Sequence, residues 1–224
     1  MTPTQSRKPH PVEISNPPRR ETTTIRPSVH PLASITPTMV YYFTSSAVEP
    51  PGFIYVGKDK FESTSSRPFY EDLIRYGWDE DVWFHVDKLS SAHVYLRMRE
   101  GQTWDALPDA LLADLAQLTK ANSIEGNKKD NVAVIYTPWS NLRKDGSMDV
   151  GQVSFKDARK VRRVLVAARE NPVVNRLNRT RVEQRPDLKQ LRDERLAELR
   201  RREQAAAQTR VRAPARCIAD LADT

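Results

Sequence analysis

The sequence predicts an α+β protein with a single mixed or antiparallel sheet of about six strands, packed helices and a charged C-terminal helix. Two short runs within residues 81–97 alternate apolar and polar positions, which is typical of strands because successive side chains point to opposite faces. Four leucines between residues 107 and 118 recur at spacings of four, four and three, which indicates an amphipathic helix. The charged run from Arg192 to Arg202 predicts a solvated helix.

The distribution of charge, glycine and proline sets the expected domain boundaries. Residues 156–224 carry 19 basic and 10 acidic side chains, so the net charge of +7 is a property of the C-terminal part. All seven glycines lie between residues 52 and 151, and eight of the sixteen prolines lie in the first 38 residues. The predicted parts are a disordered leader (1–38), a domain (39–170), a charged helical arm (171–207) and a disordered tail (208–224).

The leader is rich in Pro, Thr, Ser and Arg and has no periodic apolar pattern, so it is expected to stay disordered. A strand pattern begins abruptly at Met39. One interpretation is that Met39 is the true initiator and that the leader is an annotation artefact or an optional extension.

The cysteine count and the hydropathy pattern bear on the cellular compartment. The single cysteine, Cys217, excludes an internal disulfide framework and a cysteine-based zinc site, which favours a reducing compartment. No apolar run approaches the ~18 residues of a membrane span, and the first residues lack the apolar centre of a signal peptide. The cytoplasm is the expected location, with the nucleus as a second one.

Short apolar runs bounded by turn residues predict the other strands. These strands are Val40–Thr44, Phe53–Gly57, Val132–Tyr136, Gln152–Phe155 and Val161–Val166. A short helix is predicted over Tyr70–Tyr76, and the leucine helix is predicted to end at Lys120, where the helix dipole favours a cation. A third helix is predicted from Asn171, as N-cap, to about Arg185, with Pro186 kinking or restarting it.

The two alternating runs predict an antiparallel hairpin with Asp81 opposite Arg97, Trp83 opposite Tyr95, His85 opposite His93 and Asp87 opposite Ser91. This register places the aliphatic side chains on one buried face. The opposite face then carries Trp83, His85, His93, Tyr95 and Arg97. Either this second face is a docking surface, or a helix covers it and its rings are core residues.

The motifs for catalysis are weak. His85, Asp87, Ser90 and Ser91 contain the residue types of a nucleophilic triad, but no GxSxG turn surrounds either serine. Two histidines across a hairpin lack further ligands at metal-site spacing, and no glycine-rich phosphate loop is present. Neither an enzyme nor a cofactor is therefore expected.

Nucleic-acid binding fits the residues better. Aromatic rings stack on exposed bases, while lysine and arginine contact phosphates. The second face supplies rings, and Lys58, Lys60, Lys120, Arg143 and Lys144 would edge it. The basic C-terminal helix either adds salt-sensitive affinity for an RNA-rich surface or is an ordinary solubilising helix.

Seven motifs carry a family resemblance. In chain order they are MVYYFTSS, GKDK, DLIRYGW, DVWFHVDKLSSAHVYLR, LTKANSI, VIYTPWSNLRK and MDVGQVSF. With these motifs, residues 39 to about 185 closely resemble the NFACT-R domain family in its small stand-alone form. The resemblance implies an RNA-binding or ribosome-associated role without catalysis, because this domain also occurs in ribosome quality-control factors that engage transfer RNA on the large subunit. The family pattern falls on Lys58, Asp59, Lys60, Trp83, His85, Ser91, His93, Arg97, Lys120, Tyr136 and Thr137.

Three features depart from the family pattern. The leader precedes the point where the family begins, and Ser63–Phe69 has no counterpart, so it is an extended loop or a translated intron. The family continues as a long charged coiled coil with an acidic end, whereas this chain ends in TRVRAPARCIADLADT. That ending weakens the expectation of coiled-coil partnering by the tail.

The sequence therefore predicts a non-enzymatic RNA-binding or ribosome-associated module that contacts transfer RNA or the ribosome. The predicted nucleic-acid-binding residues are Lys58, Lys60, Trp83, His85, Ser91, His93, Tyr95, Arg97, Lys120, Tyr136, Thr137, Arg143 and Lys144. One alternative is a protein-interaction adaptor acting through the helix beyond Asn171. The other is a DNA-binding protein, because phosphate contacts alone do not separate DNA from RNA.

Overall fold

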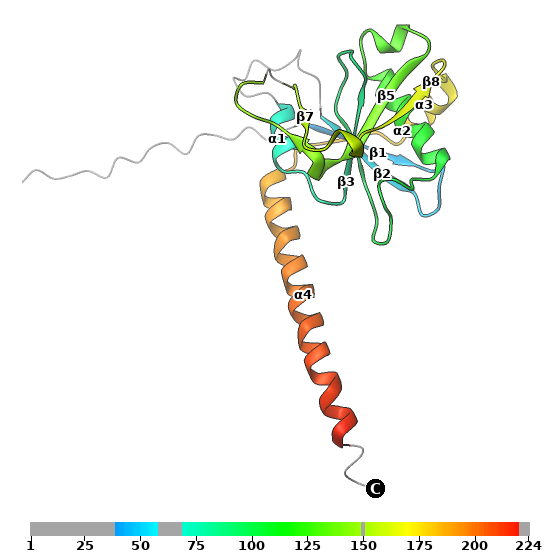
Figure 1. Ribbon diagram of the computed structural model, residues 1–224. Coiled ribbons are helices and arrows are strands. Elements are labelled where there is room, and N and C mark those ends of the chain that lie inside the picture. Colours follow the sequence, from blue (N-terminus) through cyan, green and yellow to red (C-terminus); the bar gives the residue numbers. More distant parts are fainter. Residues whose placement is uncertain (1–38, 58–68, 149–150, 220–224) are drawn as a thin grey trace, which may run out of the picture. The chain divides into compact units, whose positions relative to one another are not determined.

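The computed structural model describes residues 39–57, 69–148 and 151–219 (Figure 1). The predicted leader, most of the 63–69 insert and the predicted binding residues Lys58 and Lys60 lie outside these ranges.

Seven strands form one sheet in the order β8-β5-β3-β4-β2-β1-β9, and every neighbouring pair is antiparallel. The strands are β1 (Val40–Ser45), β2 (Gly52–Gly57), β3 (Asp81–Val86), β4 (Val94–Arg97), β5 (Val132–Pro138), β8 (Arg162–Val166) and β9 (Val182–Gln184). The predicted strand at 152–155 is not in this sheet. Its last residues, β7 (Ser154–Phe155), pair with β6 (Leu142–Arg143) in a separate two-stranded ribbon. The predicted α+β class is confirmed.

The predicted hairpin register is confirmed in the ladder between β3 and β4. Asp81 pairs with Arg97, and Trp83 pairs with Tyr95. The ladder places Val82 opposite Leu96 and Phe84 opposite Val94, so the aliphatic side chains of both strands share one face, as the alternation required.

This aliphatic face packs against α2 (Asp109–Ala121), whose Leu111, Leu115 and Leu118 are buried in the same core cluster as Val82 and Phe84. Leu177 of α3 (Asn171–Asn178) joins the same cluster. Full burial of a leucine side chain stabilises a fold by about 1.5–3 kcal/mol. The leucine spacing therefore positions α2 across the sheet and supplies much of the core.

The opposite face of the sheet, called the aromatic face below, carries Tyr55, Trp83, His85, His93 and Tyr95. The elements packed on it are α1 (Phe69–Arg75), η3 (Trp139–Asn141), the β6–β7 ribbon and the start of α4 (Leu188–Ala219). They contribute Leu73, Trp139, Leu142, Phe155 and Leu188 to a second hydrophobic cluster. The sheet is thus covered on both faces.

The predicted helix from Asn171 to Arg185 is wrong in its second half, because α3 ends at Asn178 and Val182–Gln184 forms β9 beside β1. The hydroxyl of Thr180 donates to the Leu177 carbonyl and accepts the Thr44 N–H, which leads the chain from the helix to the sheet edge. The cap of α3 is Glu170, so the prediction of Asn171 as N-cap is also wrong.

Pro186 was predicted to kink or to restart the helix, and the second outcome is observed, because helix α4 starts after Pro186. The Asp187 side chain accepts the N–H of Gln190 at the first turn of α4. The helix continues to Ala219, beyond the predicted end at Ala207. Figure 1 shows α4 beginning beside α1. Within the described residues, none of the helices combines the length and apolar character that crossing a bilayer demands.

One prediction concerns the close approach of Gly77 to Trp139. The indole Nε1 of Trp139 donates to the carbonyl of Ile74 at 2.7 Å, and a Cβ added at Gly77 would overlap the indole ring. Replacing Gly77 by alanine therefore displaces Trp139 and breaks this bond, and we expect a loss of about 2–3 kcal/mol in the free energy of unfolding. Urea unfolding measures the loss.

Gly146→Ala is the matched control, because a Cβ at Gly146 meets no atom within 4 Å. Equal unfolding midpoints for Gly77→Ala and Gly146→Ala would contradict the packing of Trp139 on Gly77.

Candidate nucleic-acid interface

The aromatic face is not an exposed docking surface, so the predicted stacking of bases on Trp83, His93 and Tyr95 is wrong. Trp83 and His93 are each 2% exposed and Tyr95 is fully buried. Phe155 of the β6–β7 ribbon packs edge-on against Trp83, with ring centroids 5.8 Å apart, and Tyr95 stacks on Tyr55. The alternative of a covered face holds, although the cover includes a strand ribbon as well as helices.

His85 and His93 lie together inside this covered face. Their rings meet edge to face at 5.3 Å, and His85 stacks on Trp83. His93 Nε2 donates to the Gly151 carbonyl at 3.0 Å, and His85 Nδ1 donates to the Val86 carbonyl at 2.7 Å. Burial lowers the pKa of both side chains, that of His93 to about 3. Neither imidazole is therefore a phosphate-binding cation at neutral pH.

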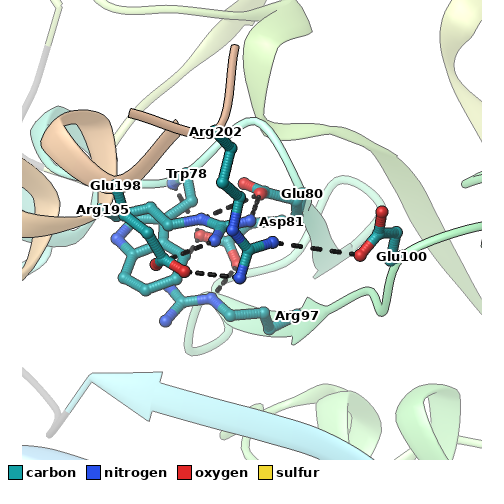
Figure 2. Close-up of polar contacts among 8 residues, drawn as sticks. All are labelled: Trp78, Glu80, Asp81, Arg97, Glu100, Arg195, Glu198 and Arg202. Atoms are coloured by element: carbon teal, nitrogen blue, oxygen red, sulfur yellow. Dashed lines mark hydrogen bonds and ion pairs between the residues drawn. The ribbon is translucent and has the colours of Figure 1, made fainter. Parts of the chain in front are cut away.

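Arg97 is committed to an internal ion pair (Figure 2). Its Nε and Nη2 donate to the two carboxylate oxygens of Asp81 at 2.9 and 3.1 Å, and the Asp81 side chain is fully buried. The guanidinium also lies 3.5 Å from the ring centroid of Trp78. Burial disfavours the charged form, but the bonds and charge of Asp81 outweigh it and raise the pKa of Arg97. The predicted contact of Arg97 with phosphate thus competes with a buried carboxylate.

Four other predicted binding residues make internal contacts. Lys120 is fully buried, and its Nζ donates to the carbonyls of Gly126 and Lys129, so this side chain closes the loop after α2. Burial lowers the pKa of Lys120. Thr137 is fully buried and donates to the Lys160 carbonyl, and Tyr136 stacks on Phe84. The Ser91 hydroxyl is half-buried and accepts the Val86 N–H. An exposed binding role for Lys120, Tyr136 and Thr137 is therefore wrong.

The two predicted cations on the β6–β7 ribbon differ in exposure. The Arg143 side chain is 65% exposed and lies 4.0 Å from Asp145. The Lys144 side chain is 20% exposed, and its Nζ lies 3.8 Å from Glu71. Arg143 is therefore the more accessible of the two.

One basic surface of the described residues was missed by the sequence prediction. It is called the basic edge here and consists of Lys156, Arg159, Lys160, Arg162 and Arg163. These side chains follow β7, pass through η4 (Ala158–Lys160) and enter β8, which is an edge strand of the sheet. All five residues are exposed, and Asp157 is the only acidic residue between 156 and 163.

Only part of this positive charge is compensated. Arg159 pairs with Asp157 at 3.2 Å, and Arg163 pairs with Asp87 at 2.6 Å. Lys156 donates to the Ser140 carbonyl, and Arg162 lies 5.5 Å from the Trp104 ring centroid. Within the described ranges, no ion pair involves Lys156, Lys160 or Arg162. Lys160 also interacts electrostatically with Asp157. The basic edge therefore presents exposed cations whose charge is only partly compensated.

The signal for this surface was present in the sequence as the run KDARKVRR at 156–163. The run overlaps a predicted strand, and its charge was counted only as part of the C-terminal excess. Across the described part of the chain, no cluster of three or more His, Cys, Asp or Glu side chains could hold a metal ion.

Comparisons with known proteins agree on one family. A family model described as "NFACT protein RNA binding domain" matches residues 39–157. Coiled-coil domain-containing protein 25 of Danio rerio is 55% identical over 150 residues, which are 67% of this chain and 69% of the relative. The Bos taurus protein of the same name is 54% identical over 151 residues, with the same two shares. A Dictyostelium discoideum homologue is 46% identical over 157 residues, 70% of this chain and 72% of that protein.

Proposed function

The chain belongs to the NFACT-R family of RNA-binding domains, and from this membership we propose that it binds RNA through phosphate contacts made by the basic edge. The observation that carries the proposal is the row of exposed cations at 156–163, three of which form no ion pair among the described residues. Lysine and arginine at such a surface neutralise phosphates and release counterions.

The proposed mode of recognition follows from the buried rings. Trp83, Tyr95 and Tyr136 pack inside the domain, so they are not stacking platforms for unpaired bases. Contacts from a basic edge position an RNA backbone without reading its sequence. Binding is therefore proposed to be sequence-independent and strongly dependent on salt, and to favour a folded RNA that presents closely spaced phosphates.

The proposed setting is the ribosome or transfer RNA in the cytoplasm, with no catalytic step and no cofactor. Support comes from the family's RNA-binding character and from the side chains of His85 and Ser91, which bond to backbone groups. DNA is the alternative ligand, since phosphate contacts are common to both nucleic acids.

The test compares two variants that each remove three positive charges. We expect Arg159→Gln/Lys160→Gln/Arg162→Gln to bind a labelled RNA hairpin about tenfold more weakly at about 100 mM salt, with a shallower dependence of affinity on salt. Fluorescence anisotropy between about 50 and 200 mM salt measures both quantities.

The control is Arg179→Gln/Arg181→Gln/Arg185→Gln at the opposite edge, beside β9, where all three residues are also exposed. Equal weakening by the two triple variants would reject the basic edge as the binding site, because the affinity would then depend only on the total positive charge of the protein. A DNA hairpin of the same sequence tests the alternative ligand, and ribosome sedimentation of the same two variants tests the proposed setting.

A further inference from the structure

In the stretch of helix α4 from Arg200 to Arg210, Arg202 lies 4.0 Å from Glu100 of the domain and pairs with Glu198 of the same helix. Among the described residues, no ion pair involves Arg200, Arg201 or Arg210. Every residue from Arg200 to Arg210 is exposed. This stretch, called the arm here, reads RRREQAAAQTR and contains four arginines against one glutamate. It contains no Leu, Ile, Val, Met or aromatic residue, so it has no apolar stripe that could pack against another helix. Its charge instead suits a polyanion.

The first half of α4 is docked on the domain. The Arg192 guanidinium lies 5.0 Å from the ring centroid of Trp139 and donates to the Arg75 carbonyl. Arg195 pairs with Glu80 and Glu198 and lies 5.6 Å from the Trp78 ring, as Figure 2 shows for its ion pairs. These contacts fix where the arm leaves the domain.

The docked part of α4 and the basic edge meet at η3. Arg192 contacts the ring of Trp139, and Lys156 donates to the carbonyl of the next residue, Ser140, at 2.7 Å. The Asn141 side chain donates to the Asp157 carbonyl at 2.9 Å, which ties η3 to the beginning of η4. Three consecutive residues of η3 thus connect the base of α4 with the basic edge.

We propose that the arm and the basic edge form one RNA-binding surface that is continuous through η3, so that a single RNA contacts both. The inference rests on the proposed function and adds a second group of contacts to it. Because the base of α4 is docked, the arm is held near an RNA already bound at the basic edge, and its contacts form at a high effective concentration. An RNA long enough to reach both parts then binds more tightly than either part alone allows.

The experiment uses the full chain and a labelled RNA hairpin. The arm variant is Arg200→Gln/Arg201→Gln/Arg210→Gln, whose three side chains are exposed, and circular dichroism checks that its helix content is unchanged. We expect one hairpin per chain, and an affinity that the arm variant lowers by about three- to tenfold at about 100 mM salt. The β9-edge variant described above is the charge-matched control and should change the affinity less than about twofold.

The possible results of this experiment separate a failure of the combined surface from a failure of the proposed RNA binding. If the arm variant binds like wild type while the basic-edge variant is weakened, the arm takes no part and the proposed function stands. Two hairpins per chain, or weakening by the arm variant alone, would mean that the two parts are not one surface. If wild type binds neither the RNA hairpin nor its DNA counterpart, the proposed function fails and the inference fails with it.

Discussion

Replacing Arg97 by methionine is expected to lower the free energy of unfolding by about 3–5 kcal/mol, because it leaves the buried carboxylate of Asp81 without its counter-charge. Asp81 accepts four bonds in the native state. They come from Tyr55 Oη at 2.7 Å, from the Trp78 N–H at 2.7 Å, and from the Nε and Nη2 of Arg97. Two neutral donors remain in the variant, and they do not compensate a full charge away from water.

The partner variant tests whether charge is the cause. In Arg97→Met/Asp81→Asn the carboxylate is replaced by an amide whose oxygen still accepts from Tyr55 and Trp78. We expect this double variant to be more stable than Arg97→Met alone, since removal of both charges costs less than removal of one. Urea unfolding of the three proteins provides the comparison.

The more exposed pair of Arg163 and Asp87 is the control. The Arg163 side chain is 60% exposed and that of Asp87 16%, against 24% for Arg97 and 0% for Asp81. Arg163→Met should therefore cost less than about 1 kcal/mol. If Arg97→Met costs no more than Arg163→Met, the Asp81 carboxylate is not the buried centre described above. An RNA-binding assay with Arg97 variants is informative only after this stability measurement, because a partly unfolded protein also loses binding.

Local pattern was sufficient to predict most of the sheet. Alternation in β3 and β4 gave the register of Trp83 with Tyr95, because a shift by one residue would have placed the aliphatic side chains of the two strands on opposite faces of the sheet. The spacing of leucines gave α2 for a similar reason, since burial on one face demands a helical period. β9 was missed because its three residues form a strand only by pairing with β1.

The candidate site was harder to predict from the sequence, because exposure depends on contacts between distant segments. The β6–β7 ribbon has two residues in each strand, too few for a periodic signal, yet it covers Trp83. Lys120 was expected on the surface at a helix end, but the loop from Gly126 to Lys129 folds over it and supplies carbonyl acceptors. The sequence therefore indicated which residue types could bind a nucleic acid, but the fold decides which of them are accessible, and the side chains of Lys156, Arg159, Lys160, Arg162 and Arg163 are exposed.

The pH dependence of stability should report the burial of His93. Its pKa is about 3 in the folded protein and 6.5 ordinarily, because burial and the neighbouring His85 and Lys144 charges disfavour the imidazolium. The Gly151 carbonyl, which accepts from Nε2, opposes this shift only in part. The folded state therefore strongly prefers the neutral ring.

The sign of the effect follows from the two pKa values. Above pH 6.5 the ring is neutral in both states and its contribution to stability is fully present. Between pH 6.5 and about 3 the unfolded chain takes up the proton first, so stability falls as the pH falls, by about 1.4 kcal/mol per pH unit. At about pH 5 the expected loss is about 2 kcal/mol. The pKa of His85 is lowered as well, and this adds a loss in the same direction.

The variant His93→Gln separates this loss from the titration of carboxylates. Aspartates and glutamates titrate in both proteins, so they cancel in the difference between wild type and variant. We expect urea unfolding midpoints of wild type to fall from about pH 7 to about pH 5 more steeply than those of the variant, even though the variant is less stable at neutral pH. Equal slopes would mean that His93 accepts a proton in the folded protein, which a ring packed between Trp83, His85 and the Gly151 carbonyl cannot do without leaving its place.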